Sequence, residues 1–315
     1  MLEALNNIVP LAICFTTPLL IIALGGLVSE RSGVVNIGLE GILGFGAFTS
    51  AYVLNVVLND FSFISLCIAL VSGAIAGGFF SLIHAFASIT MKANQVISGT
   101  ALNILSPALA IYLSRIFAGS ANIGIKQGFL KTNVPLLSKI PFLGVLFRDA
   151  YITSLLVLII VIITWFILYR RPLGLRLRSC GENPHAADSA GINVNRMRYL
   201  GVFVSGTFAG LGGAIIITTY AGEFSINIYN GLGFLALAAL IFGKWKPFGV
   251  LVAALFFGIT KTSAEISTMN NLLKEMPQII FTTFPYVATL IALVVFSKNS
   301  VSPKAAGEPF EAGKR

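Results

Sequence analysis

The chain has 315 residues, of which 56% are hydrophobic and only 10% are charged, and its mean hydropathy is +0.89. A soluble protein of this size needs more polar surface than this composition supplies, so the sequence predicts a membrane protein. The formal net charge of +9 would suit a nucleic-acid partner, but the basic residues cluster at the ends of apolar segments. We therefore expect contact with membrane lipid and no nucleic acid.

Apolar segments of the length that a transmembrane helix needs follow one another along the chain. The first comes after a start that lacks the basic region of a cleavable signal, so we expect it to be retained. The sequence predicts an all-α, polytopic membrane helical bundle of about nine transmembrane helices, with eight to ten allowed by the ambiguous region 29–44. The predicted crossings are 9–28, 41–58, 63–90, 95–118, 150–169, 200–220, 233–243 with its neighbours, 247–264 and 276–297.

One segment, residues 170–199, carries six arginines and only two acidic residues between two apolar runs. By the positive-inside rule this segment is a cytoplasmic loop. Alternation from it places the N-terminus and the loop 119–149 outside the cell. We therefore predict a transmembrane domain over residues 1–297 and a cytoplasmic tail over 298–315.

The arginine-rich loop contains a short segment with helix start and stop signals. Asn183 is a typical N-cap, and Pro184 suits the first helical position because its missing N–H would be unbonded there. Gly191 can adopt the left-handed conformation that ends a helix. A short helix with defined ends in a cytoplasmic loop predicts a contact with a molecule outside the membrane.

Residues 32–41, SGVVNIGLEG, are too rich in glycine for a lipid-facing helix. Irregular backbone at membrane depth survives only where protein or a water-filled cavity satisfies its amide groups. We therefore predict a re-entrant or broken helix that lines a transport path. A similar sequence, NIYNGLGF at 227–234, raises the hypothesis of an internal repeat, because matching interrupted segments mark the central site of repeat-built transporters.

Two polar residues of the broken segment are candidates for this path. Asn36 and Glu40 are four residues apart and share a face if the segment is helical. A carboxylate at membrane depth costs ~2.5–3.5 kcal/mol on insertion scales and normally faces a cavity or a partner. Arg31 is the nearest candidate partner. An ion pair that anchors the end of a span is the alternative interpretation.

The predicted crossing at 95–118 carries a polar stripe. Gln95, Gly99 and Asn103 recur at helical spacing, with Thr100 beside them. The two amides could hydrogen-bond a polar solute in the path, and Gly99 would leave room for it. The alternative is that these amides hold neighbouring membrane helices together by hydrogen bonds.

Two further patterns favour structural roles. His84 has no carboxylate at helical spacing, so we interpret it as a buried structural residue instead of a proton relay. Gly73 and Gly77, and likewise Gly206 and Gly210, form small-residue faces that let two helices approach closely. The three cysteines have no pairing spacing, so we expect neither a disulfide nor a metal site.

Motifs for ATP hydrolysis and for common hydrolases are missing from the sequence. It contains no G-x-x-x-x-G-K-[ST] phosphate loop, no H-E-x-x-H and no G-x-S-x-G. We therefore expect no enzyme activity and no cofactor. If ATP powers transport, another polypeptide must hydrolyse it.

Several blocks of the sequence resemble one family of membrane proteins. LRSCGENPHAADSAGI at 177–192 resembles the coupling loop of ABC-importer permeases of the branched-chain amino acid, ribose and nucleoside group. Within this group, the chain is most similar to the shorter permease subunit of bacterial nucleoside (simple-sugar-type) importers. The other matching blocks are GLVSERSGVVNIGLEG at 26–41, GTALN at 99–103, AALIFGKWKP at 238–247, PYVATL at 285–290 and SPKAAGEPF at 302–310.

The resemblance implies a permease subunit of an ATP-binding-cassette importer in a bacterial cell (inner) membrane, which moves a nucleoside or a related ribose or simple-sugar solute into the cytoplasm. The implied partners are a cytoplasmic ABC ATPase, a second, longer permease subunit and an extracytoplasmic solute-binding lipoprotein. The residues implied in ATPase coupling are Gly181, Glu182, Asn183, Pro184, His185, Ala186, Ala187, Asp188 and Gly191. The candidates for the solute path are Asn36, Glu40, Gln95, Thr100 and Asn103.

The competing hypothesis is an ion-coupled secondary transporter of a small polar solute. Such a transporter needs ionisable residues inside the membrane, and the sequence offers only Glu40 and His84. This hypothesis also leaves the capped helix of the arginine-rich loop without a role.

Overall fold

The computed structural model describes residues 2–133, 149–269 and 302–311, together with residues 283 and 287. The predicted crossing 276–297, apart from 283 and 287, and the centre of the predicted outer loop 119–149 lie outside the described residues. The helices are α1 Leu2–Arg31, α2 Leu39–Tyr52, α3 Phe63–Ala85, α4 Gln95–Ala118, α5 Ile152–Arg170, α6 Pro172–Glu182, α7 Pro184–Ser189, α8 Val194–Ile216, α9 Leu232–Phe242 and α10 Pro247–Met269.

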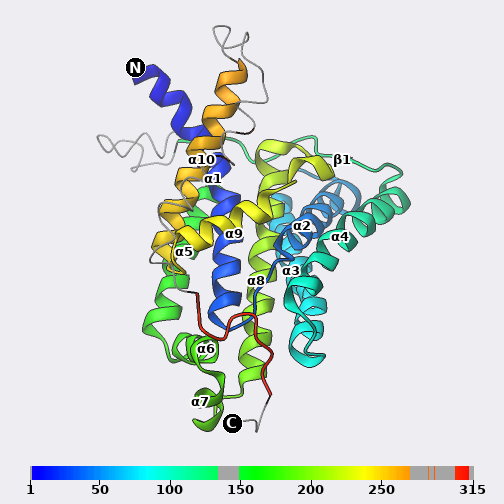
Figure 1. Ribbon diagram of the computed structural model, residues 1–315. Helices are drawn as coiled ribbons and strands as arrows, with labels where there is room; N and C mark the ends of the chain where they lie inside the picture. The colour runs from blue at the N-terminus through cyan, green and yellow to red at the C-terminus, as the bar shows by residue number, and fades with distance from the viewer. Residues whose placement is uncertain (1, 134–148, 270–282, 284–286, 288–301, 312–315) are drawn as a thin grey trace.

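Short π-helical turns extend three of the helices, and two short strands pair at one end of the bundle. Wider π-helical turns lengthen α2, α3 and α8, at Val53–Leu58, Phe86–Thr90 and Ile217–Ala221. Strand β1, Ile123–Gly124, pairs antiparallel with β2, Glu223–Phe224, and a 3-10 turn, Ile226–Ile228, follows β2. Figure 1 shows β1 at the opposite end of the bundle from α6 and α7. We call the end with α6 and α7 the loop end, and the other the far end.

The described helices agree with the predicted crossings. Six helical stretches of the described chain are long and apolar enough to span a membrane: Ile8–Arg31, Leu39–Leu58, Phe63–Thr90, Gln95–Ala118, Ile152–Arg170 and Val194–Ala221. Two shorter apolar stretches, Ile226–Phe242 and Pro247–Ser263, coincide with the seventh and eighth predicted crossings. The protein is therefore an all-α, polytopic membrane bundle.

The seventh predicted crossing, 233–243, differs from a simple span. α9 has 11 residues, which at a rise of about 1.5 Å each is too short for a hydrocarbon core of about 30 Å. Gly231, with φ +80°, comes just before α9, and a turn at Lys244 and Trp245 follows it. Figure 1 shows α9 running across the direction of α1. These two turns keep α9 short and inclined to the long helices.

Small residues allow α8 to lie at the centre of the bundle, where it packs against α1, α2 and α3. A Cβ on Gly77 would lie 2.5 Å from the Gly206 carbonyl oxygen and 2.7 Å from the Gly210 Cα. Gly73 faces the same part of α8, and Gly46 brings α2 against Gly210 as well. The predicted small-residue faces of α3 and α8 therefore pack directly on each other, backbone against backbone.

The close approach of α3 and α8 predicts that Gly210→Ala destabilises the protein. The added Cβ would overlap the backbone of Gly73 and Gly77, neither of which can move aside without shifting a helix. We expect a loss of about 1–3 kcal/mol, measured as a lower thermal unfolding midpoint in detergent. Gly124→Ala is the matched control, because its new Cβ would meet no atom within 4 Å. Equal midpoints for the two variants would contradict this packing.

Candidate functional site

α7 begins and ends as its sequence predicts. The Asn183 side chain accepts a hydrogen bond from the Ala186 N–H at 3.0 Å, and Pro184 is the first helical residue. Gly191 has φ +79°, and its N–H donates to the Asp188 carbonyl at 2.9 Å. These capping bonds give a helix of only six residues defined ends.

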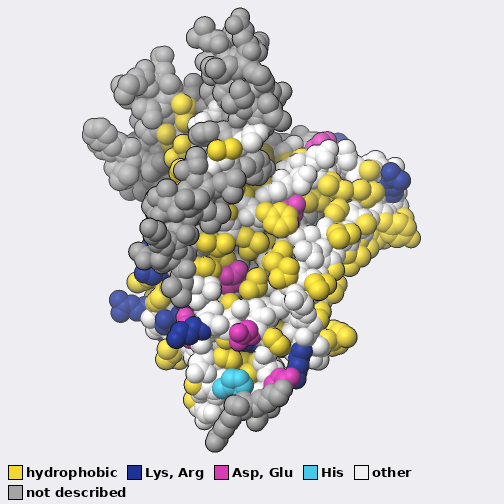
Figure 2. Space-filling view, viewed as in Figure 1, with side chains coloured by type: hydrophobic (Ala, Val, Ile, Leu, Met, Phe, Trp, Pro, Cys, Tyr) yellow, Lys and Arg dark blue, Asp and Glu magenta, His cyan; other side chains and the backbone are white. Residues whose placement is uncertain are grey.

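One side of α7 faces the protein and the other faces outward. Pro184 and Ala187, three positions apart, are buried, as is Gly181 just before the helix. The other residues implied in ATPase coupling are exposed: Glu182, Asn183, His185, Ala186, Asp188 and Gly191. A groove of about 880 Å³ lies beside them, between α6 and the start of α8. Figure 2 shows charged side chains and a histidine around the loop end, below a largely hydrophobic surface.

The predicted coupling loop, 170–199, is more ordered than its sequence suggests. It contains α6 as well as α7, and from Val194 on it is already the first part of α8. α6 packs closely on the end of α5, where Gly174 meets the backbone of Ile167 and Leu168 and Arg178 Nε donates to the Leu168 carbonyl at 3.0 Å. Its start has the same signal as α7, a proline at the first helical position, which our sequence analysis did not use.

The last residue of α1 binds the loop end. Arg31 Nη2 donates to the Trp245 carbonyl at 2.8 Å, and Arg31 Nη1 lies 3.4 Å from Glu182 Oε1. The predicted pairing of Arg31 with Glu40 is therefore wrong. The turn after α1 and the return of the chain into the bundle separate Arg31 from Glu40, which lies in the first turn of α2.

Residues 302–311 of the predicted tail lie across the loop end, and we call this segment the strap (Figure 1). Its Ala305 N–H donates to the Gly181 carbonyl at 2.9 Å, and its Gly307 N–H donates to the Gly33 carbonyl at 3.3 Å. Phe310 is buried, and its ring centroid lies 5.3 Å from that of the His185 ring. Phe310 packs in one apolar cluster with Cys180, Ala187 and Val194. The strap therefore joins α6 and α7 to the turn that follows α1.

A buried arginine completes this connection. Arg198, in α8, is 1% exposed, and its Nη1 donates to the Glu308 carbonyl of the strap at 2.8 Å. Its guanidinium lies against Gly33, where φ is +97° and a Cβ would come within 2.9 Å of Nη2. In the sequence, Arg198 is one of six arginines of the predicted cytoplasmic loop. No local pattern in the sequence distinguishes it from the five exposed or partly exposed arginines of the same loop.

Residues 32–38 leave the loop end and run into the bundle without forming a helix. A side chain from α4 bonds the backbone N–H of Val35, and a side chain from α3 bonds its carbonyl. Its N–H donates to Gln95 Oε1 at 2.7 Å, and its carbonyl lies 3.1 Å from His84 Nε2. The Asn36 side chain, fully buried, donates to Ser205 Oγ of α8 at 3.0 Å. The predicted break in the helix is thus present, and surrounding protein satisfies its backbone.

Asn103 holds the start of α2 in the same way. Its Nδ2 donates to the Ile37 carbonyl at 3.0 Å, and its Oδ1 accepts from the Gly41 N–H at 2.8 Å. Thr100 is instead exposed and bonds back to its own helix at the Val96 carbonyl. Of the predicted stripe, Gln95 and Asn103 therefore contact the broken segment and Thr100 does not. Both amides thus hold the backbone of the broken segment or of the start of α2, which is a structural role close to the predicted alternative.

His84 has a hydrogen-bond partner at each ring nitrogen. Because the Val35 carbonyl can only accept, His84 Nε2 carries a proton and donates it to that carbonyl, while Nδ1 lies 3.0 Å from Ser98 Oγ, which can donate or accept. Both ring nitrogens are thus engaged, and the side chain is 0% exposed. This arrangement matches the structural role predicted for His84 and leaves no free nitrogen for a proton relay.

Three of the five candidates for the solute path have a buried polar atom without a hydrogen bond. Asn36 Oδ1, Glu40 Oε2 and Gln95 Nε2 are buried and have no hydrogen-bond partner among the described residues. Tyr229, which the sequence analysis did not single out, has a buried hydroxyl in the same condition. Buried polar atoms are nearly always bonded, so each such atom needs an explanation.

Metal binding has no evident site in the described residues. No group of three or more His, Cys, Asp and Glu side chains there could hold a metal ion, and all three cysteines are free. Burial raises the pKa of the Cys180 thiol at the loop end, so this cysteine stays protonated and unreactive.

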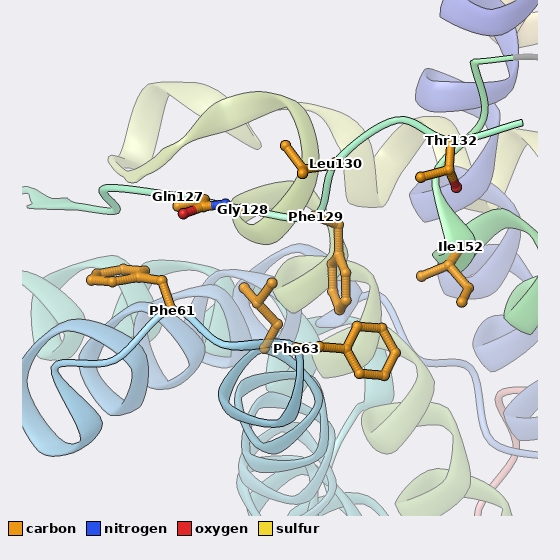
Figure 3. A pocket seen from close by; sticks show the side chains of 9 residues that line it. Phe61, Phe63, Gln127, Gly128, Phe129, Leu130, Thr132 and Ile152 are labelled. Atoms are coloured by element: carbon orange, nitrogen blue, oxygen red, sulfur yellow. The ribbon is translucent and has the colours of Figure 1, made fainter.

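At the far end, an apolar pocket of about 220 Å³ gathers three phenylalanines, Phe61, Phe63 and Phe129 (Figure 3). The rings of Phe63 and Phe129 meet edge to face, with their centroids 5.9 Å apart. Gln127 and Thr132 are its only lining residues with polar side chains. The pocket is smaller than the about 300–1,000 Å³ usual for a small-molecule site, and we interpret it as packing between the far-end loops.

Comparisons with known proteins identify a family of permeases. The family model described as branched-chain amino acid transport system / permease component matches residues 10–296. The guanosine ABC transporter permease protein NupQ of Bacillus subtilis is 44% identical over 99% of both chains. The nucleoside ABC transporter permease protein NupC of Lactococcus lactis is 39% identical over 97% of this chain and 96% of that protein.

A solved structure shares the fold. It is described as an inward-facing conformation of a metal-chelate type ABC transporter, and it matches with a TM-score of 0.51 and 19% identity over 91% of this chain and 85% of that chain. This likeness bears on the fold alone. From the family match and the relatives, the chain belongs to the family of branched-chain amino acid transport system permease components.

Proposed function

We propose that this protein is the permease subunit of an ABC importer that moves nucleosides into the cytoplasm of a bacterium. The observation that carries the proposal is α7, a helix with capped ends that stands exposed at the loop end of a permease-family chain. The sequence has no phosphate loop, so the energy of ATP must enter through a contact with another protein. α7 is the element best placed to make that contact.

α7 and the residues beside it have separate tasks in this proposal. The exposed side chains of Glu182, His185 and Asp188 meet a groove of the ATPase, together with Asn183 and Ala186. Pro184 and Ala187 hold the helix against the rest of the protein, and Gly191 sets its end. A rigid helix transmits a push from the ATPase better than a flexible loop would, because little of the movement is lost in bending.

The path from α7 into the membrane passes through two contacts. Gly181 lies directly against the turn after α1, where its Cβ position is 3.1 Å from the Gly33 nitrogen. The strap adds a second link, since it is bonded to both Gly181 and Gly33. Gly33 leads into residues 34–38 and so to the start of α2. Movement of α7 would therefore reach α2 without crossing a flexible segment.

The partners and the solute follow from the same proposal. A permease component works within a transport system, and we infer a cytoplasmic ABC ATPase, a second, longer permease and an extracytoplasmic solute-binding lipoprotein. ATP is then used by the ATPase, and the chain itself is no enzyme and needs no cofactor. The names of NupQ and NupC, one for guanosine and one for nucleosides, support a nucleoside as the solute. Both relatives come from bacteria, and the apolar helices need a membrane, so we infer a bacterial cell membrane as the location.

Uptake by the reconstituted complex tests the proposed function. Vesicles that contain this chain, its longer permease, the ATPase and the binding protein should accumulate radiolabelled guanosine only when ATP and the ATPase are present. Uptake that needs an ion gradient and no ATPase would favour the ion-coupled transporter instead. Failure to take up any nucleoside would contradict the proposed solute.

Gly191→Val should uncouple ATP hydrolysis from transport while the protein stays folded. A residue with a Cβ pays roughly 1–2 kcal/mol for the left-handed conformation at this position, so the end of α7 should rearrange. A Cβ there would meet no atom within 4 Å, so packing is not disturbed. We expect ATP hydrolysis stimulated by the solute, and guanosine uptake, to fall several-fold.

Gly191→Asn is the matched control, because asparagine tolerates the left-handed conformation that ends a helix. It should keep most of the uptake and of the stimulated hydrolysis. If the valine variant is coupled as well as the asparagine variant, α7 does not transmit the movement of the ATPase.

Phe310→Ala should weaken the attachment of the strap and with it the coupling. The buried ring fills a space between Cys180, Ala187 and Val194, and its removal leaves a cavity in this cluster. We expect solute-stimulated ATP hydrolysis to fall, with a small decrease in the thermal unfolding midpoint. Lys304→Ala, at an exposed position of the same strap, should change neither quantity. Unchanged hydrolysis in the Phe310 variant would show that the strap takes no part in coupling.

A further inference from the structure

The two glycine-broken segments of the sequence meet in the structure. One leads from Gly33 to the start of α2, and the other passes through Gly231 to the start of α9, and both glycines have positive φ. α2 and α9 pack against each other, and Figure 1 shows them side by side. In transporters built from repeats, interrupted segments that meet inside the bundle form the central site. The contact between these two helix starts is therefore the place to look for solute recognition.

The contact is reciprocal, with a side chain of each element lying over a glycine of the other. A Cβ on Gly233 of α9 would come within 2.5 Å of the Glu40 Cβ, and a Cβ on Gly44 of α2 would lie 2.6 Å from the Tyr229 hydroxyl oxygen. Glu40 and Gly44 are one helical turn apart, so they share a face of α2. The Glu40 carboxylate and the Tyr229 hydroxyl therefore lie at the same α2–α9 contact.

The Tyr229 hydroxyl and one carboxylate oxygen of the half-buried Glu40 are buried without a hydrogen-bond partner among the described residues. Tyr229 is 3% exposed, yet its hydroxyl bonds to no described residue, and neither does the buried Oε2 of Glu40. Arg31, the nearest cation in sequence, is engaged by Glu182 and the Trp245 carbonyl. Asn103, in the neighbouring α4, already uses its amide oxygen and its amide nitrogen to bond the start of α2 and the Ile37 carbonyl. A carboxylate and a hydroxyl left unbonded inside a membrane bundle are costly, which points to a ligand that supplies the missing bonds.

We propose that Glu40 and Tyr229 form a subsite for the adjacent hydroxyl groups of a ribose. A carboxylate can accept hydrogen bonds from two neighbouring hydroxyls, and acidic side chains bind ribose hydroxyls in this way in nucleotide-binding proteins. The Tyr229 hydroxyl can donate to or accept from the same sugar. The subsite rests on the proposed function, and ribose is the part that different nucleosides share.

Competition between ribonucleosides and deoxynucleosides tests this subsite in the complete reconstituted complex. Unlabelled guanosine should inhibit uptake of labelled guanosine about tenfold better than 2′-deoxyguanosine does, because the deoxy sugar leaves one carboxylate bond unmade. Glu40→Gln keeps the size of the side chain and removes the charge. It should lower guanosine uptake about tenfold and shrink the preference for the ribose form.

Tyr229→Phe separates recognition from folding. Removing an unbonded buried hydroxyl should not lower the thermal unfolding midpoint, whereas removing a structural hydroxyl would. Guanosine uptake should nevertheless fall several-fold. Tyr112→Phe is the matched control, since that side chain is 63% exposed, and it should leave uptake unchanged.

The possible failures of the subsite and of the proposed function are distinct. A wild-type complex that takes up guanosine and 2′-deoxyguanosine equally well would overturn the subsite but not the nucleoside importer. The same holds if Glu40→Gln keeps the ribose preference, or changes only the choice between guanosine and adenosine, because the carboxylate would then read the base. A wild-type complex that takes up no nucleoside would overturn both.

Discussion

The structure depends on how residues 34–38 are bonded where they pass through the bundle without helical hydrogen bonds. In a membrane interior, water is not available to satisfy such backbone groups, so side chains must do so. His84 and Gln95 bond the two sides of Val35, and Asn103 joins the Ile37 carbonyl to the Gly41 N–H. These bonds fix where α2 begins. They also turn what would be a flexible linker into a firm connection between the loop end and the middle of the bundle.

This connection explains why the loop end is built as it is. Burial of the charged Arg198 costs desolvation free energy that an exposed arginine would not lose. Its side chain lies between the turn at Gly33 and the Glu308 carbonyl. The strap bonds the same turn to α6, which continues into α7. A displacement of α7 is thus coupled to the segment that starts α2, and α2 carries the Glu40 that meets α9. A continuous series of contacts therefore connects α7, the proposed contact with the ATPase, to the proposed ribose subsite.

Much of the fold was predictable because it rests on local patterns. Apolar length predicted the long helices, glycine spacing predicted a close-packing face on α3 and another on α8, and Asn183, Pro184 and Gly191 predicted both ends of α7. The contacts of the candidate site were harder to predict, because the residues that meet there are distant in the sequence. The pairing of Arg31 with Glu182, the burial of Arg198 and the strap all join residues more than 100 positions apart. No pattern in the sequence predicts that the Tyr229 hydroxyl lacks a hydrogen-bond partner. The glycine-broken segment 227–234, which contains Tyr229, was nevertheless recognisable in the sequence.

Hydrogen exchange at two backbone amides tests the central claim most directly. In the folded protein, the N–H groups of Val35 and Gly41 should exchange slowly although neither belongs to a regular helical bond inside α2, because Gln95 and Asn103 hold them. Gln95→Leu should speed exchange mainly at Val35, and Asn103→Leu mainly at Gly41. Fast exchange at both amides in the unmodified protein, or no change in either variant, would contradict the account.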